Sequence, residues 1–445
     1  MSVTDKRLLD VAHFADLTSW SVLDVVGGRI KSNFPIVPLS RILKRIKDPV
    51  NIERDVQYKR ITIRQHGRGV VLRDEIKGEE IGTKRQFIAH AGLLIISRID
   101  ARNGAFGIVP VELEGAIVTN DFWLFEVQNA SPEYLMLVLS SKSFQAQWQS
   151  QSSGTTNRQR VTEDRFLATQ VILPPEDTQR ELCEGYNAKI KLSRELIKLS
   201  NEVKVASEDY FLSVLSISSF PQSHINNSVM YTYRYKNLTR WDVWALASGN
   251  LASNIYQSVP FAQIIVGKPL YGANEKTIKT KTDVRYIRIT DINDDGTLGD
   301  DFVSASNVDQ KYILKENDFL IARSGNTVGK TFLYTAAVGR AIFAGYLVKY
   351  VLNSEKVLPE YLFYYTKSCV FRQWIESNKR IFGQPNINGK EYLSAPIILP
   401  PLAIQQKIVV RLKAMSLKSR ALSLKAEECL RDARRRFDEV VFNET

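Results

Sequence analysis

Apolar and small residues recur three and four positions apart over many turns in two stretches of the chain. In the central stretch they are Leu196, Leu199, Val203, Ala206, Tyr210 and Val214, and in the C-terminal stretch they are Ile408, Leu412, Met415, Ser419, Leu422, Ala426, Cys429, Ala433, Phe437 and Val440. This spacing places each series on one stripe of an α-helix. At 1.5 Å per residue each helix would be roughly 50–60 Å long, too long to be covered by a small domain. We therefore expect the two helices to pack against each other; packing of each on its own domain, or on a second chain, is the alternative.

Each predicted long helix follows the same short motif. Residues 173–179 read Leu-Pro-Pro-Glu-Asp-Thr-Gln and residues 399–405 read Leu-Pro-Pro-Leu-Ala-Ile-Gln, each after a short apolar run typical of a strand. A proline suits the first turn of a helix, because the missing N–H has no partner there and φ is already set. Each motif therefore predicts a strand followed by the sharp start of a helix.

The motif belongs to a longer internal repeat. Residues 55–62, 94–98 and 132–135 resemble residues 283–290, 319–323 and 359–362, at offsets of 225 to 228 residues. Several repeated segments alternate between apolar and polar residues as strands do. Each half is therefore predicted to be a mixed α/β (α+β) domain followed by one long helix. The copies differ in their loops, such as 66–69 and 293–296, so we expect the two domains to recognise different targets.

Length, charge and cysteine content narrow the class of protein. The 445 residues allow two or three domains, at about 150 residues per domain. The formal net charge of +12 and the pI near 9.4 suit a surface that binds a polyanion. Cys183, Cys369 and Cys429 lie in apolar helical patterns, which indicates buried thiols in a reducing compartment. The N-terminus carries no signal-peptide pattern and no apolar run approaches a membrane span, so we expect a cytoplasmic protein.

Motifs for catalysis are weak or missing. Residues 324–331 nearly spell a phosphate-binding P-loop, but Ser324 replaces its first glycine and the following residues favour a strand over a helix. An ATP-dependent enzyme using Lys330 and Thr331 is therefore an alternative and not the favoured hypothesis. The sequence also lacks the glycine-rich cofactor loop and the Asn/Asp-Pro-Pro-aromatic motif that a DNA methyltransferase needs, and its histidines lack the spacing of a zinc site.

Polar loops precede both Leu-Pro-Pro motifs. Residues 154–160 and 379–390 contain glycine and are rich in Arg, Asn, Gln and Lys. Arg pairs with guanine, and Asn or Gln with adenine, in the major groove of DNA, while Lys and Arg also neutralise phosphates. The loops therefore favour DNA recognition over the alternative of ordinary solvated surface.

The whole chain resembles the specificity subunit of type I restriction-modification systems. The resemblance rests on the two-fold repeat, the Leu-Pro-Pro-x-x-x-Gln motifs, the stretch Gly383-Gln384-Pro385-Asn386-Ile387 and the loop Arg323-Ser324-Gly325. It implies two target-recognition domains, each reading one half of a bipartite site on double-stranded DNA, separated by two long antiparallel coiled-coil helices. It also implies no catalytic residue and no cofactor in this chain. S-adenosylmethionine, ATP and Mg²⁺ are expected only in partners: two modification (methyltransferase) subunits and, in complexes that have them, restriction (translocase/endonuclease) subunits.

Boundaries and DNA contacts follow from this resemblance. We expect recognition domains at 1–172 and 221–398 and spacer helices at 173–220 and 399–445. The predicted DNA-binding residues are Arg64, Arg68, Arg98, Arg102, Asn157, Arg158, Arg160, Arg323, Lys330, Lys379, Arg380, Gln384 and Asn386. A coiled-coil scaffold protein without DNA binding is a second alternative.

Overall fold

The computed structural model describes most of the chain as two compact units. The described residues are 32–65, 67–100, 104–142, 144–145, 162–217, 253–278, 280–379 and 384–443. Unit 1 comprises Met1–Glu195 and Lys425–Thr445, and unit 2 comprises Leu196–Leu424. Each unit therefore contains one part of each long helix. The limits predicted from the sequence assign each long helix to a separate segment instead, and those limits stay a prediction.

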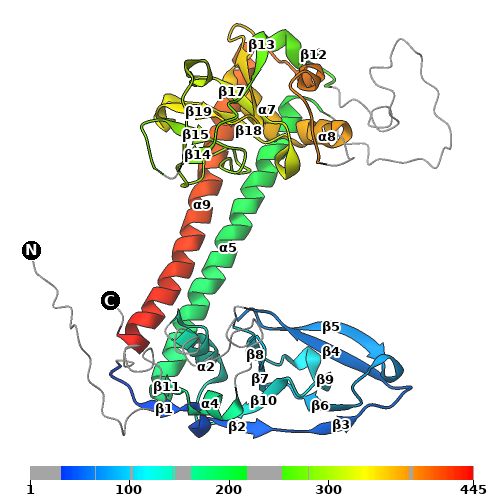
Figure 1. The fold of residues 1–445 in the computed structure, drawn as a ribbon, viewed down its shortest axis with the longest axis vertical. Helices are drawn as coiled ribbons and strands as arrows, with labels where there is room; N and C mark the ends of the chain where they lie inside the picture. The colour runs from blue at the N-terminus through cyan, green and yellow to red at the C-terminus, as the bar shows by residue number, and fades with distance from the viewer. Residues whose placement is uncertain are drawn as a thin grey trace, which may run out of the picture. The chain divides into compact units, whose positions relative to one another are not determined.

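Unit 1 is built on three antiparallel or mixed sheets (Figure 1). One sheet has the order β2 (Leu43–Ile46), β10 (Phe122–Val127), β7 (Leu94–Ser97), β8 (Phe106–Ile108). A second has the order β3 (Pro49–Asn51), β6 (Arg85–Ala89), β9 (Ala116–Val118), β4 (Gln57–Ile63), β5 (Val70–Lys77), and the third pairs β1 (Ile36–Pro38) with β11 (Gln170–Ile172). The helices α2 (Pro132–Leu139) and α4 (Glu163–Ala168) complete the domain. All four residues of β7 are buried, which explains why Leu94, Ile95 and Ile96 are apolar without alternation.

Unit 2 repeats this plan. Its four-stranded sheet has the order β13 (Ile265–Tyr271), β20 (Leu347–Leu352), β17 (Phe319–Ala322), β18 (Thr331–Leu333), and β12 (Ser258–Pro260) pairs with β21 (Pro396–Ile398). Two further pairs are β14 (Thr277–Ile278) with β16 (Ser304–Ala305) and β15 (Arg285–Ile287) with β19 (Ala341–Phe343). The helices are α7 (Pro359–Lys367) and α8 (Cys369–Asn378). The predicted mixed α/β repeat is thus confirmed.

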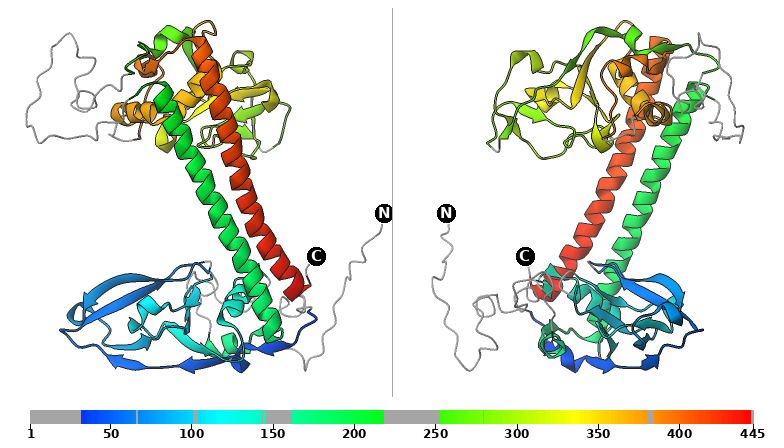
Figure 2. Two further views of the ribbon diagram at one scale, coloured as in Figure 1. Left: turned by 180° about the vertical axis from the view of Figure 1, so that it is seen from behind. Right: turned by 45° about the vertical axis from the view of Figure 1, so that its right-hand side comes forward.

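The predicted long helices are α5 (Glu176–Val214, 39 residues) and α9 (Leu402–Phe442, 41 residues). They lie side by side in each view (Figures 1 and 2). In unit 1, Ser193 Oγ donates to Ala426 O at 2.9 Å, and in unit 2, Ser200 Oγ donates to Ser419 O at 2.9 Å. The later residue of α5, Ser200, thus meets the earlier residue of α9, Ser419. The two helices are therefore antiparallel, as expected.

The side of α5 that faces α9 differs from the predicted stripe. Leu199 is 47% exposed and Ala206 is also exposed, so their assignment to the helix–helix interface was wrong. Ser193 and Ser200 take this place, each with 1% exposure. Their hydroxyls bond to the facing helix, and a small side chain lets the two backbones approach. On α9 the residues of the predicted stripe are buried or half-buried except at its end, where Val440 is 37% exposed.

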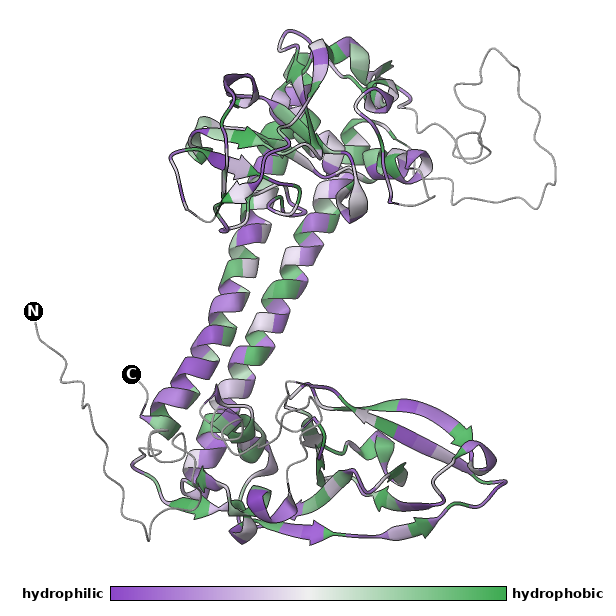
Figure 3. Ribbon diagram, in the orientation of Figure 1, coloured by the Kyte–Doolittle hydropathy of each residue, from purple (hydrophilic) through white to green (hydrophobic). Residues whose placement is uncertain are grey.

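Hydropathy varies along the sheets and the long helices (Figure 3). Hydrophobic residues gather in the inner strands of both units, whereas hydrophilic residues cover much of the β4–β5 hairpin and of α5 and α9. None of the described helices is long and apolar enough to cross a lipid bilayer. Cys183 and Cys429 are buried and Cys369 is half-buried, and all three are free thiols. Burial raises the pKa of Cys183 to about 11 and that of Cys369 to about 12, so both thiols stay protonated and unreactive near neutral pH.

The Leu-Pro-Pro-x-x-x-Gln motif has the same structural role in both units. Gln179 Oε1 accepts from Ser131 N, and its Nε2 donates to Pro174 O, both at 2.8 Å. Gln405 Oε1 accepts from Leu358 N at 2.8 Å, where α7 begins. Each glutamine therefore ties the start of a long helix to the start of the short helix beside it.

Candidate nucleic-acid interface

The loop after β17 in unit 2 brings together three of the residues predicted to bind DNA. Arg323 N donates to Tyr346 O at 2.9 Å, and Ile387 N donates to Arg323 O at 3.0 Å, so the backbone of Arg323 is held from both sides. Gly325 has φ of +71° and its N donates to Pro385 O at 2.9 Å. A Cβ at Gly325 would lie 3.1 Å from Gln384 Nε2, which shows how closely the two loops pack.

Neighbouring residues fix the position of the Arg323 side chain without occupying all of its hydrogen-bond donors. Its guanidinium lies over the rings of Tyr271 and Tyr346, at 5.2 and 5.8 Å from their centroids, and its Nε donates to Gly345 O at 3.1 Å. Among the described residues, no acceptor pairs with its two terminal nitrogens. Tyr271 and Tyr346 are 40% and 53% exposed. The result is an orientated, partly exposed fork of donors of the kind that binds guanine or phosphate bidentately.

Gln384 and Asn386 lie beside this arginine. Gln384 is exposed and Asn386 is half-buried, and the backbone of Asn386 forms an isolated bridge with Ser324. The stretches 323–325 and 383–387 are two of the features by which the sequence resembles the specificity subunits. Their described residues therefore form one surface. The two tyrosines were missed from the sequence, because they come from strands and loops distant in the chain.

Lys330 is tied to the loop that is unique to the second half. Its Nζ lies 2.7 Å from Asp294 Oδ1 and 3.4 Å from Ile292 O. Hydrogen bonding and charge from Lys330 lower the pKa of Asp294. The ion pair offsets the charge of Lys330, and its contact with DNA stays a prediction. Lys379 likewise pairs with Glu376, one helical turn earlier.

The near P-loop does not have the structure of one. Thr331 begins strand β18 and is buried, with its hydroxyl 2.9 Å from that of Thr366. The short turn Gly325–Thr327 is 3₁₀, and no helix follows the Gly-Lys-Thr sequence. Without a helix N-terminus the loop lacks the donors that cradle phosphate. The ATP-dependent alternative is therefore not supported.

Lys367, which the sequence did not single out, lies beside this loop. Its Nζ donates to Asp294 O and Thr331 O, each at 3.2 Å, and lies over the Phe363 ring at 5.1 Å. Burial lowers the pKa of Lys367 to about 8. It anchors the 293–296 loop and presents no free charge to solvent.

In unit 1, Arg98 follows β7 as Arg323 follows β17. Its N donates to Asp121 O at 2.9 Å, and its guanidinium lies 5.5 Å from the Trp123 ring centroid. Its buried Nε has no hydrogen-bond partner within the described part of the chain. Arg45 lies nearby, and its Nε is 3.3 Å from Glu163. Burial, more than the charge of Arg98, lowers the pKa of Arg45.

The β4–β5 hairpin carries the other described candidates of unit 1. Arg64 and Arg68 are exposed near its turn, where Arg64 N donates to Gly69 O and Arg68 Nε donates to Gln65 O. Arg60 and Arg73 lie on the same hairpin and were not predicted. The remaining candidates, Arg102, Asn157, Arg158, Arg160 and Arg380, lie outside the described residues. Within the described ranges no group of three or more His, Cys, Asp or Glu residues could hold a metal ion.

Comparison with known proteins gives consistent matches. The family described as Type I restriction modification DNA specificity domain matches residues 43–204 and again residues 262–425. The specificity subunit of the type I restriction enzyme EcoEI from Escherichia coli is 28% identical over 103 residues, which is 22% of this chain and 17% of that subunit. The chain thus matches only a small part of that relative's length.

Comparison with solved structures gives matches over most of the chain, and the first of them supports the fold. A chain from a structural study of complex assembly and conformational transition of the type I R-M system superposes with a TM-score of 0.56 at 17% identity. The match covers 93% of this chain and 98% of that chain. The HsdS subunit from Thermoanaerobacter tengcongensis gives a TM-score of 0.47 at 17% identity, covering 94% and 99% of the two chains.

Proposed function

This chain belongs to the type I restriction modification DNA specificity family and carries two copies of its domain, and on that premise we propose that it selects the DNA site of a type I restriction-modification complex. Each unit reads one half of a bipartite site on double-stranded DNA. The chain itself performs no chemistry and binds no cofactor. S-adenosylmethionine, ATP and Mg²⁺ act in the partner subunits, and the complex works in the cytoplasm.

The observation that supports this proposal best is the fixed orientation of the Arg323 guanidinium at the surface of unit 2. Two tyrosine rings and the bond from Nε fix its orientation, while no described residue accepts from its terminal nitrogens, which leaves them for a ligand. A good bidentate contact of arginine with guanine discriminates by about 1–3 kcal/mol. A net charge of +12 adds the sequence-independent attraction to phosphates.

Exposed apolar residues on α9 support docking of modification subunits on the long helices. Val410, Leu417 and Leu424 are 60%, 61% and 52% exposed and follow one another at intervals of seven residues. Residues at this interval lie on one stripe of a helix. An exposed apolar stripe marks a protein contact, and we assign this one to two modification subunits of the complex, with restriction subunits as further partners.

Methylation mapping tests the reading of half-sites. The chain is combined with its methyltransferase partner, and methylated adenines are sequenced for the wild type and for Arg323→Ala. We expect the variant to relax or weaken one half-site by about 1–3 kcal/mol and leave the other unchanged. Arg340→Ala is the matched control, because Arg340 is exposed in the same unit but pairs with Asp283 at 3.0 Å.

The other candidate residues follow the same logic. Arg158→Ala and Arg160→Ala should act on the first half-site, and Arg380→Ala and Gln384→Ala on the second. Uniform weakening across all sequences would make them phosphate contacts. Replacing residues from about 225 to 395 by those of a relative should change one half-site alone; a change in both would refute independent reading.

Two further outcomes would refute the proposed function as a whole. Methyl transfer or DNA cleavage by the purified chain, after complete removal of partners, would show that the chain is an enzyme. Absence of salt-dependent DNA binding in the assembled complex would favour the coiled-coil scaffold instead.

A further inference from the structure

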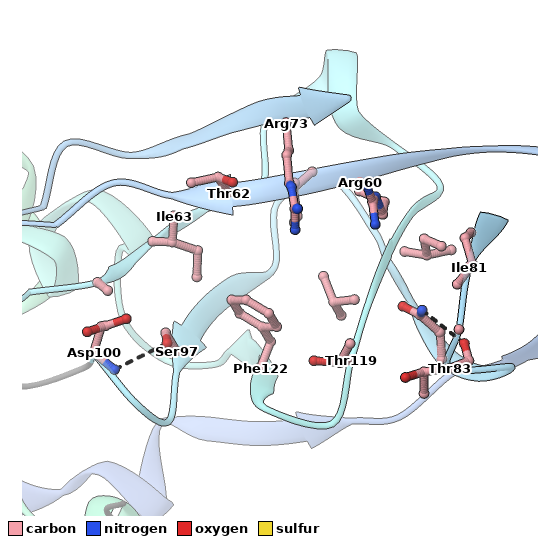
Figure 4. A pocket seen from close by; sticks show the side chains of 16 residues that line it. Arg60, Thr62, Ile63, Arg73, Ile81, Thr83, Ser97, Asp100, Thr119 and Phe122 are labelled. Atoms are coloured by element: carbon pink, nitrogen blue, oxygen red, sulfur yellow. Dashed lines mark hydrogen bonds between the residues drawn. The ribbon is translucent and has the colours of Figure 1, made fainter. Parts of the chain in front are cut away.

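Unit 1 contains a cavity of about 380 Å³ between the β4–β5 hairpin and the strands β6, β7, β9 and β10 (Figure 4). It exists because β4 and β9 pair at a single position, Arg60 with Ile117, beyond which the two strands separate. A register shift between Arg60 and Ile61 marks a bulge in β4 beside the opening. Ligand sites in proteins occupy about 300–1,000 Å³, so the cavity has room for a small molecule.

The cavity combines an aromatic wall with polar groups. Figure 4 shows Arg60 and Arg73 on the side of the hairpin and Phe122, Ser97 and Thr119 facing them. Phe122 is partly exposed, so one part of its ring is open to a ligand. Aromatic side chains bind nucleobases by stacking on their faces.

Gln86 supplies an acceptor that no described residue uses. This residue lines the cavity and is 4% exposed. Its Nε2 donates to Thr83 O at 3.1 Å, which orientates the amide, while no described group donates to its Oε1. The oxygen is not closed off from the cavity, because it is absent from the buried side-chain atoms that lack a partner. A ligand with an amine at this position would donate to it.

Ser97 adds a donor to the lining of the same cavity. It is 7% exposed, and its Oγ accepts from Asp100 N at 3.3 Å. Its hydroxyl proton is therefore left for a ligand. Together Gln86 and Ser97 provide one acceptor and one donor on largely buried residues, the pair that an edge of a nucleobase requires.

The two arginines at the cavity are not equivalent. Arg60 makes two bonds of 2.7 Å to the Asp74 carboxylate, which neutralises its charge and lowers the pKa of Asp74. Arg73 Nε is 3.5 Å from Asp74 Oδ2, its side chain is 59% exposed, and no described residue accepts from its terminal nitrogens. Arg73 is therefore free to bind a phosphate.

We propose that this cavity binds one nucleotide, with its base against Phe122, an exocyclic amine donating to Gln86 Oε1, and its phosphate at Arg73. The site is separate from base reading in the groove of a stacked duplex. The nucleotide is either free or displaced from a DNA strand, and only the second source rests on the proposed function. Displacement from a duplex costs a few kcal/mol of unstacking, least where the base is already unpaired.

Nucleotide binding to the full-length chain tests the proposal. Calorimetry would compare dAMP, dCMP and dGMP, which carry an exocyclic amine, with TMP, which does not. We expect TMP to bind at least about tenfold more weakly, the equivalent of about 1.4 kcal/mol. Gln86→Met, which removes the acceptor at similar length, should abolish this preference, and Gln86→Glu should retain it.

Two arginine variants separate the phosphate contact from a general effect of charge. Arg73→Ala should weaken all four nucleotides alike. Arg85→Ala should change none of them, because Arg85 precedes Gln86 in β6 and successive side chains of a strand point to opposite faces. Displacement of dAMP by a single-stranded oligonucleotide would identify DNA as the source, and lack of displacement would identify a free nucleotide.

The proposal and the proposed function fail in different ways. If none of the four nucleotides binds, or if folded Gln86→Met keeps the base preference, the nucleotide site is refuted even when the complex still methylates its bipartite site. If nucleotides bind as expected but the complex directs methylation to no defined sequence, the proposed function is refuted and the nucleotide site remains.

Discussion

Gln405 lies on α9, and its side chain bonds to the start of α7 in unit 2. Replacing Gln405 by methionine should destabilise the start of α7 more than replacing an exposed residue of α9 would. The carboxamide is fully buried and makes three bonds: from Leu358 N at 2.8 Å, to Lys356 O at 3.0 Å and to Pro400 O at 2.8 Å. Methionine has a similar length and removes all three. At about 1 kcal/mol net per bond the loss is about 3 kcal/mol.

Hydrogen exchange measures this loss where it occurs. Gln405 Oε1 is the acceptor of the Leu358 amide, so the peptide spanning residues 356–362 should exchange faster in the variant. A loss of about 3 kcal/mol corresponds to roughly a hundredfold change in the opening equilibrium. Mass spectrometry of exchange under native conditions resolves this change for the peptide.

Two variants control the result. Gln406→Met alters the exposed neighbour of Gln405 on α9 and should leave exchange unchanged. Gln179→Met removes the two bonds of the equivalent residue in unit 1 and should cost about 2 kcal/mol. Equal exchange in Gln405→Met and Gln406→Met would refute the idea that the motif glutamine holds the two helix starts together.

Three other predictions concern the long helices and one histidine. Ser200→Ala removes the buried bonds from Ser200 to α9 and should lower the free energy of unfolding by about 1–3 kcal/mol, measured with urea. Inserting four residues after Lys198, matched by four after Arg420, lengthens both helices by about 6 Å and should lengthen the spacer of the methylated site by one or two base pairs at about 3.4 Å each; an unchanged spacer would refute a measuring role. Hydrogen bonds to Glu114 and Asp48 raise the pKa of His90, so its contribution to stability should be complete below about pH 6.5 and lost as pH rises through the folded pKa. Melting of wild type and His90→Ala should therefore differ more in acid than in alkali, and the reverse order would contradict the assignment.

The repeat and the long helices could be predicted because periodicity and proline act locally. Three- and four-residue spacing requires only a helix with one covered face, and Pro175 and Pro401 lie just before the helices they start. The interface on α5 could not be predicted in the same way. Ser193 and Ser200 are polar, and only the facing backbone shows that their hydroxyls have partners there.

The candidate DNA surface was predicted in part for a similar reason. Side-chain type marked Arg323, Gln384 and Asn386, but Tyr271 and Tyr346 act on Arg323 from other strands and loops. Ion pairs between residues that are distant in the sequence also determine which charged side chains remain unpaired. Lys330 meets Asp294 only through tertiary structure, so the sequence counted a charge that an ion pair offsets.

The packing of the end of α9 into the core of unit 1 has a consequence for biosynthesis. Phe437 and Val441 are buried in the same cluster as Leu39 and Tyr134, and the rings of Phe437 and Tyr134 lie 5.9 Å apart. At about 5–20 residues per second, a ribosome that has completed β11 needs some tens of seconds to reach Phe437. During this interval the first unit lacks part of its core, so nascent chains that stop before residue 425 should be cleaved by protease in unit 1 and should require chaperone protection that the finished chain does not.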